Sequence, residues 1–373
     1  MRRDAGIELA RIFAMLLIII MHINTQGGLA EALVPMSLHY TVAWYFLCIT
    51  YCAVNLFAII SGYVGACQEK FRYSRILPLW LSVVFYTILV TACFAVFRPG
   101  TVDVMDFIKA VTPASSGTYW FFSAYFAMFF LMPFMNYLLR ELDEKQIKIL
   151  GWTILIVFSV IPTLRHTDPW VTDRGYSTIW LMCMYMLGGS LRRLKLLERK
   201  GKRFWGCVFL ICSLVAWGSK ILLEYVMVML TGELRGGGLL VSYLSPLMVL
   251  EAIAALGFFV NCRVKNQSVA KVIVAVSATA FSVYILHEQP FIKHYFIKGR
   301  FAGYAEQNVA VMVLLVLGTA AAVFGICAAI DMIRIKLFQV LHIRELSIKL
   351  CAAAEAAIQK RGILQDTNDR KQP

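Results

Sequence analysis

The stretch RIFAMLLIIIMH, from Arg11 to His22, places ten consecutive apolar residues between a guanidinium and an imidazole. With its apolar flanks, this segment is long enough to cross a hydrocarbon core of ~30 Å as a helix. Eleven helical steps rise ~16 Å and return to within ~20° of the starting direction, so the two side chains share one face. Ionisable groups inside a bilayer are costly unless they face protein or water. The stretch therefore predicts a helix bundle whose first helix turns a polar face inward.

The rest of the chain is equally apolar. Of its 373 residues, 60% are hydrophobic and 16% are charged, whereas soluble domains are nearer half apolar and a quarter charged. Lipid offers no partner for an unpaired backbone group, so helices are the expected elements. We predict an all-α polytopic integral membrane protein with about ten transmembrane helices. The predicted spans are 7–25, 41–66, 76–97, 119–140, 147–165, 175–194, 204–230, 238–260, 272–291 and 307–330.

The basic residues orient these spans. Of 36 Lys and Arg residues, 26 fall in the termini and in the connections after even-numbered spans, and eight fall in the other connections. The remaining two, Arg11 and Lys220, lie inside spans. The positive-inside rule then predicts that both termini are cytoplasmic. A basic cytoplasmic face in contact with anionic lipid explains the net charge of +14, so no nucleic-acid partner is expected.

The chain is expected to form a single transmembrane domain over 1–343 and a short, partly disordered cytoplasmic tail over 344–373. The stretch DMIRIKLFQVLHI (331–343) is expected to form an amphipathic helix on the membrane surface after the last span. The first span is expected to be retained, because residues 25–28 (TQGG) give no small-x-small cleavage site.

A second basic site opens the third span. The stretch EKFRYSRILPLW (69–80) contains Arg72 and Arg75, which share a face if the segment is helical. Two guanidiniums at a membrane edge suit bidentate phosphate binding, although positive-inside bias alone also explains them. A phosphorylated donor anchored there would extend a flexible arm up the bundle toward His22, over a helix rise of ~16 Å.

Further patterns occur at separate places in the chain. They are IELARIFAMLLIIIMH (7–22), with Glu8, Arg11 and His22; NLFAIISGYV (55–64); the Arg72–Arg75 pair; YWFFSAYFAMFFLMPFMNYLL (119–139); and FSVYILHEQPFI (281–292), with its Tyr-x-x-His-x-x-Pro order. Together these patterns resemble the membrane-bound acyltransferase 3 family, and the resemblance covers essentially the whole membrane region.

The resemblance implies an O-acyltransferase in a cell membrane, with a bacterial cytoplasmic membrane as the expected location. The implied donor is a cytoplasmic acyl-CoA, commonly acetyl-CoA, and the implied acceptor is a hydroxyl of an extracytoplasmic glycan. Some members carry an appended esterase-like domain, which is expected to be absent here. The protein is then expected either to act alone or to hand the acyl group to a separate extracytoplasmic partner.

Acyl transfer to a hydroxyl needs a base for the hydroxyl proton and a group that stabilises the developing oxyanion. His22 is the predicted base, and a transient acyl-imidazole on the same residue is the alternative. Glu288 is the predicted orienting partner and His287 a predicted donor on the acceptor side, because both end the ninth span near the depth of His22. Four residues at the inner mouth are assigned to the acyl-CoA donor: Arg11, Arg72, Arg75 and Glu8, with Glu8 holding Arg11. No metal is expected.

Two other classes of function stay open. A carrier or flippase for a phosphorylated lipid or small anion would also place arginines at the inner mouth, although the chain lacks the internal repeats that are usual in carriers. A non-catalytic scaffold or sensor would tolerate the loss of His22 and of the arginine pair. Release of free CoA thiol separates an acyltransferase from both.

Overall fold

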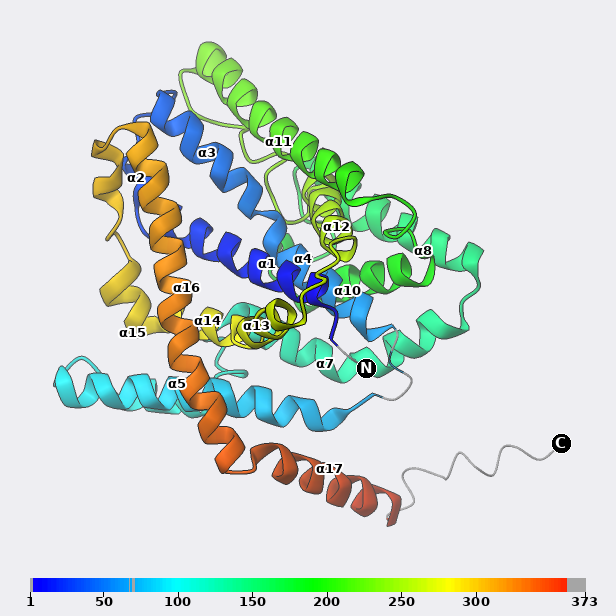
Figure 1. Cartoon of the computed structure of the whole chain (residues 1–373). Coiled ribbons are helices and arrows are strands. Elements are labelled where there is room, and N and C mark those ends of the chain that lie inside the picture. The colour runs from blue at the N-terminus through cyan, green and yellow to red at the C-terminus, as the bar shows by residue number, and fades with distance from the viewer. Residues whose placement is uncertain (1–2, 67, 69–70, 361–373) are drawn as a thin grey trace.

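The computed structural model describes residues 3–66, 68 and 71–360, and every regular element among them is a helix (Figure 1). The central helix is α1 (Ala5–Asn24), which begins where the Asp4 carboxylate accepts hydrogen bonds from the backbone N–H groups of Gly6 and Ile7. The longer helices packed against α1 are α3 (Leu38–Thr50), α4 (Cys52–Gly65), α12 (Pro246–Val260), α13 (Gln267–Ser277), α14 (Ala280–His287) and α16 (Val309–Val340).

The remaining elements complete the bundle and its connections. They are α2 (Leu29–Ala32), η1 (Tyr73–Arg75), α5 (Ile76–Phe97), α6 (Val104–Val111), α7 (Trp120–Glu141), α8 (Glu144–Leu155), η2 (Ile156–Val160), α9 (Ile161–Arg165), η3 (Asp173–Gly175), α10 (Thr178–Arg193), α11 (Lys202–Thr231), α15 (Pro290–Ile292), η4 (Lys293–Ile297), η5 (Ala302–Glu306) and α17 (Ile343–Lys360).

Eight helical segments in the described part of the chain are long and apolar enough to cross a membrane. They are Ala5–Asn24, Leu38–Gly65, Tyr73–Phe97, Trp120–Glu141, Glu144–Arg165, Lys202–Thr231, Gln267–His287 and Val309–Val340. The other two predicted spans form the shorter helices α10, with 16 residues, and α12, with 15 residues. The all-α membrane class is confirmed, and the count of ten and the cytoplasmic termini stay predictions.

The expectation of a separate surface helix over 331–343 is wrong, because α16 continues to Val340. Asp331 is fully buried there. Its carboxylate accepts a hydrogen bond from the Tyr86 hydroxyl at 2.7 Å and is paired with the Arg334 guanidinium. These partners let the helix keep a charged pair inside the bundle, as buried charges require. The tail forms α17 up to Lys360, and the predicted disorder beyond it lies outside the described residues.

The buried pair Lys220 and Glu224 in α11 is also satisfied within the protein. The two side chains form an ion pair, and the Tyr40 hydroxyl donates to the Glu224 carboxylate at 2.8 Å. The Lys220 ammonium lies 3.4 Å from the ring centroid of Trp44. This closed network gives the pair a structural role, since each charged group has a partner inside the protein.

The closest packing in the bundle joins α4 to α10. A Cβ added at Gly62 would lie 1.8 Å from the carbonyl oxygen of Tyr185, and one at Gly188 would lie 2.1 Å from that of Ile59. The same pair of helices is joined by Asn55, whose Oδ1 accepts a hydrogen bond from the Trp180 indole at 2.8 Å. Glycine therefore sets the distance between these helices, and a buried amide fixes their register.

We predict that Gly62→Ala destabilises the protein by about 1–3 kcal/mol, because the two backbones must separate to admit the methyl group. Gly218→Ala is the matched control, since a Cβ on this α11 glycine meets nothing within 4 Å. Thermal unfolding in lipid nanodiscs should show a lower melting temperature for the first variant only. Equal melting temperatures would contradict the proposed role of Gly62.

Candidate active site

One face of α1 lines a cavity of about 490 Å³ inside the bundle. Arg11, Met15, Ile18 and His22 all belong to its lining, at helical spacings of four, three and four residues. The shared face predicted for Arg11 and His22 is thus present. The cavity follows α1 between these two residues, over a rise of ~16 Å.

Residues at both ends of this cavity are partly exposed. At the Arg11 end, the arginine side chain is 27% exposed. At the His22 end, the lining includes Tyr176, which is 44% exposed, and Lys293, whose side chain is 38% exposed. A molecule at either end is therefore in reach of the same interior.

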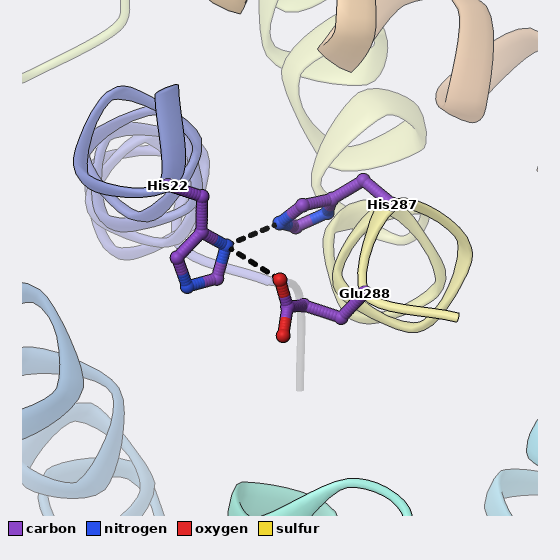
Figure 2. Close-up of side chains that lie close together, drawn as sticks. All are labelled: His22, His287 and Glu288. Carbon is purple, nitrogen blue, oxygen red and sulfur yellow. Dashed lines mark hydrogen bonds and ion pairs between the residues drawn. The ribbon is translucent and has the colours of Figure 1, made fainter. Parts of the chain in front are cut away.

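Three predicted site residues meet at the His22 end (Figure 2). His22 Nδ1 lies 3.0 Å from His287 Nε2 and 3.1 Å from Glu288 Oε1. Helix α14 ends at His287, and Glu288 follows as its capping residue. The turn at this helix end brings two consecutive residues to one nitrogen of His22.

The hydrogen bonds around His287 define the tautomer of His22. His287 Nδ1 donates to the Val283 carbonyl oxygen at 2.6 Å, so its Nε2 carries the lone pair in the neutral ring. His22 Nδ1 must then carry the proton that it shares with His287 Nε2. The lone pair of His22 is left on Nε2, which points away from both partners in Figure 2.

Glu288 balances charge on this side of the cavity. Its Oε2 lies 3.1 Å from Lys293 Nζ. Its Oε1 is close enough to His22 Nδ1 to stabilise an imidazolium, but it is buried and accepts no hydrogen bond from the described residues. The carboxylate is thus available to a cation formed on His22.

The same three side chains have the composition of a metal site. One ligand atom from each of His22, His287 and Glu288 lies within 4.8 Å of the other two. Two imidazoles and a carboxylate suit a divalent transition-metal ion. The Lys293 ammonium, which is paired with Glu288, would repel a metal cation bound to these three side chains. The expectation that the site works without a metal stays a prediction.

At the other end, Glu8 holds Arg11 as expected from their spacing. Arg11 Nη1 donates to Glu8 Oε1 at 2.6 Å, and the Ser277 hydroxyl donates to Glu8 Oε2 at 2.5 Å. Glu8 is buried, whereas the arginine remains partly exposed. The guanidinium is therefore held in place while it keeps a face toward the cavity.

Arg72 and Arg75 do not line the cavity. Arg72 caps the start of the short 3-10 turn η1 and Arg75 is its last residue, so the pair does not lie on a regular α-helix, and both are exposed. Arg75 Nη1 donates to Gln68 Oε1 at 2.8 Å. Leu79, one helical turn beyond Arg75, does belong to the lining, so the pair lies just outside the Arg11 end.

Arg75 belongs to a larger basic cluster that the sequence did not reveal. Arg3, Arg72 and Arg344 all place positive charge near Arg75, and α17, which carries Arg344, is joined to η1 by a hydrogen bond from the Ser347 hydroxyl to the Ser74 carbonyl oxygen at 2.6 Å. Tyr125 lines the cavity together with Arg11. We call Arg3, Arg72, Arg75 and Arg344 the arginine cluster; it draws on three regions far apart in the chain.

Sequence reasoning also missed two polar residues at the His22 end. Lys293 was counted only among the external charges, although it follows Glu288 by five residues. Gln26 lies in the turn just after α1, so helical spacing from His22 could not place it on the cavity face. Both belong to the lining.

A comparison with protein families found a match to an acyltransferase domain, Acyl_transf_3, over residues 4–331. The chain belongs to the acyltransferase 3 family. This match supports an acyltransferase of a membrane family and covers every residue of the cavity lining. Comparisons with curated proteins and with solved structures found no significant match.

We predict that Glu8→Ala lowers the stability of this acyltransferase by about 1–3 kcal/mol, because Arg11 and Ser277 both lose their partner. Glu144→Ala is the matched control, since it breaks a 2.8 Å pair with Lys148 in which both side chains are more than half exposed. The melting temperature should fall for Glu8→Ala and stay unchanged for Glu144→Ala. A fall of the same size in both variants would contradict a special role for Glu8.

Proposed function

We propose that this membrane protein transfers an acetyl group from acetyl-CoA to a hydroxyl of a glycan. The observation that carries the proposal is the single cavity that joins Arg11 to the free Nε2 of His22. Membership of the acyltransferase 3 family supports the reaction class. The identity of the acyl group, the donor and the acceptor belongs to the proposal.

The donor is proposed to bind at the Arg11 end. Phosphate groups of CoA would lie against the arginine cluster, because grouped guanidiniums favour a polyanion. The pantetheine arm would pass Arg11 and follow α1. The ~16 Å between Arg11 and His22 corresponds to about five extended residue lengths of ~3.3–3.6 Å.

His22 is proposed as the general base. Its Nε2 removes the proton from the acceptor hydroxyl while the hydroxyl oxygen attacks the thioester carbonyl carbon. The carbon–sulfur bond then breaks, an ester forms, and the CoA thiolate takes the proton back from the imidazolium. Glu288 stabilises that imidazolium, with its oxygen 3.1 Å from Nδ1.

His287 is proposed to act through His22. Both of its ring nitrogens are engaged, one by the Val283 carbonyl and one by His22. This arrangement favours a positioning role over the oxyanion donor that its place in the sequence suggested. The acyl-imidazole route through His22 Nε2 uses the same geometry and stays an alternative.

The proposed orientation places the Arg11 end in the cytoplasm and the His22 end outside, with a bacterial cytoplasmic membrane as the expected location. Acetyl-CoA then approaches from the side where it is made, and the acceptor glycan from the opposite side. A separate extracytoplasmic protein that receives the acetyl group is a further possibility within this proposal.

We predict that purified protein in nanodiscs releases free thiol from acetyl-CoA when an acceptor is present. His22→Ala should lower kcat by about 10²–10⁴-fold, because the hydroxyl proton loses its acceptor. Glu288→Gln keeps the shape but removes the charge, so it should lower kcat by less and leave the KM for acetyl-CoA unchanged. Full activity of His22→Ala at normal abundance would contradict the assignment, and transport without thiol release would favour a carrier.

We predict that Arg75→Gln and Arg344→Gln each raise the KM for acetyl-CoA by about tenfold, because each removes a charge-assisted contact to phosphate. Their kcat should stay near that of the wild type. Arg203→Gln removes the same charge from an exposed site on α11 and serves as the control. An unchanged KM in both cluster variants would place the CoA phosphates elsewhere.

A further inference from the structure

The His22 end of the cavity has a wall of aromatic rings. Trp120 and Tyr176 have ring centroids 4.6 Å apart, and Tyr176 and Tyr243 have centroids 5.0 Å apart. Tyr51 extends the wall, with its centroid 5.7 Å from that of Tyr243. All four rings belong to the lining. We call Tyr51, Trp120, Tyr176 and Tyr243 the aromatic wall.

The aromatic wall lies beside the proposed base. The Tyr243 hydroxyl is 3.7 Å from the sulfur of Met21, the neighbour of His22 on α1. Tyr176 is 44% exposed, so the wall reaches the surface at this end. A ligand that enters along Tyr176 is thus brought toward His22.

The aromatic wall is held in place by contacts with neighbouring segments. The Tyr243 carbonyl oxygen accepts a hydrogen bond from Asn55 Nδ2 at 2.8 Å. Gly175 lies against Tyr243, where a Cβ would come within 2.5 Å of the Tyr243 Cβ, and its φ of 98° favours glycine. The loop before it is tied by Asp168, which accepts hydrogen bonds from Thr172 and from the backbone of Arg174. A wall fixed in this way is ready to bind without rearranging.

Two acceptor oxygens near His22 have no hydrogen-bond donor among the described residues. They are Gln26 Oε1 and Glu288 Oε1, both buried and both on side chains that line the cavity. Glu288 Oε1 also lies 3.1 Å from His22 Nδ1, so Gln26 Oε1 is the one of the two without a charged neighbour of this kind. Gln26 is fixed in place because its backbone carbonyl accepts a hydrogen bond from Gly299 N–H at 3.0 Å. An unpaired buried acceptor costs about 1–3 kcal/mol, and a ligand hydroxyl that donates to it offsets this cost.

These observations describe a ligand with one apolar face and several hydroxyl donors. A sugar in its ring form has both, since the C–H groups of a pyranose lie flat against aromatic rings. An alkyl chain would leave the acceptor oxygens unpaired. A quaternary ammonium ion also suits aromatic rings, but the ammonium group itself has no N–H or hydroxyl to donate to Gln26 Oε1.

We propose that the aromatic wall is the acceptor subsite and binds a pyranose ring, with ring hydroxyls donating to Gln26 and Glu288. The role of this site as the acceptor site of the reaction rests on the proposed function. Sugar binding at this site does not depend on that function. The same residues are expected to select a sugar ring over an open-chain polyol.

Saturation-transfer NMR on the protein in nanodiscs tests the site without requiring turnover. The probes are methyl glucopyranoside and methyl galactopyranoside, with sorbitol and choline as comparison ligands. At least one pyranoside should receive saturation at its ring C–H protons, and sorbitol and choline should not. Trp120→Leu, Tyr176→Ala and Gln26→Leu should each weaken pyranoside binding about three- to tenfold.

Trp152→Leu is the control, because this tryptophan of α8 is 64% exposed and lies outside the cavity lining. Acetyl-CoA binding by each variant reports that it is folded. Tyr176→Ala, at an exposed position, keeps the test decisive if the Trp120 variant fails to fold.

The two proposals fail in different ways. Pyranoside binding that depends on the wall, without any thiol release from acetyl-CoA, would overturn the proposed function and support the sugar site. Thiol release with no pyranoside binding would overturn the sugar site alone. The sugar site would also be overturned if sorbitol bound as well as a pyranoside, or if choline bound. The same holds if Trp120→Leu and Tyr176→Ala weakened pyranoside binding no more than Trp152→Leu does.

Discussion

The high free energy of an ionisable group inside a bilayer governs the arrangement around α1. Arg11 and His22 are both carried into the bundle by one continuous helix. Each is supplied with partners from the late part of the chain: Ser277 through Glu8 at one end, and His287 with Glu288 at the other. Helices α13 and α14 must therefore lie along α1, and the space between these polar points forms the cavity.

The geometry at the His22 end depends on where α14 stops. Consecutive residues of a helix point about 100° apart, so two neighbours seldom serve one atom. Here the helix ends at His287 and Glu288 caps it, and His22 Nδ1 lies between their side chains. The Val283 carbonyl then fixes the His287 ring. A helix end, rather than a motif of spaced ligands, creates this constellation.

The sequence predicted what periodicity and charge encode locally. The spacing of Arg11 and His22 gave their common face, the pairing of Glu8 with Arg11 followed from three residues of separation, and the depth of Glu288 placed it near His22. Features that depend on distant partners were not predictable. Asp331 was assigned to a surface helix as part of the amphipathic stretch 331–343, yet Tyr86, from a helix far earlier in the chain, gives it a buried partner.

The same limit explains the arginine cluster and the aromatic wall. Arg344 was counted as tail charge, and only the position of α17 beside η1, marked by the hydrogen bond from the Ser347 hydroxyl to the Ser74 carbonyl, brings it to Arg75. Trp120, Tyr176 and Tyr243 come from three separate segments, and no spacing in the sequence relates them. Their convergence follows from the close approach of α4 and α10 and from Asn55, which binds both Trp180 and the Tyr243 backbone.

The two ends of the cavity thus differ in chemistry, and each end suits a different kind of ligand. The Arg11 end gathers guanidiniums, and the His22 end gathers aromatic rings with unpaired oxygen acceptors. A polyanion is favoured at the first end, whereas the second end, where Glu288 and Lys293 form an ion pair, has no comparable group of guanidiniums among the described residues. A neutral polyol is favoured only at the second. The same asymmetry of Lys and Arg that predicts the orientation of the chain in the membrane would then also separate donor from acceptor, with His22 at the point where the two can meet.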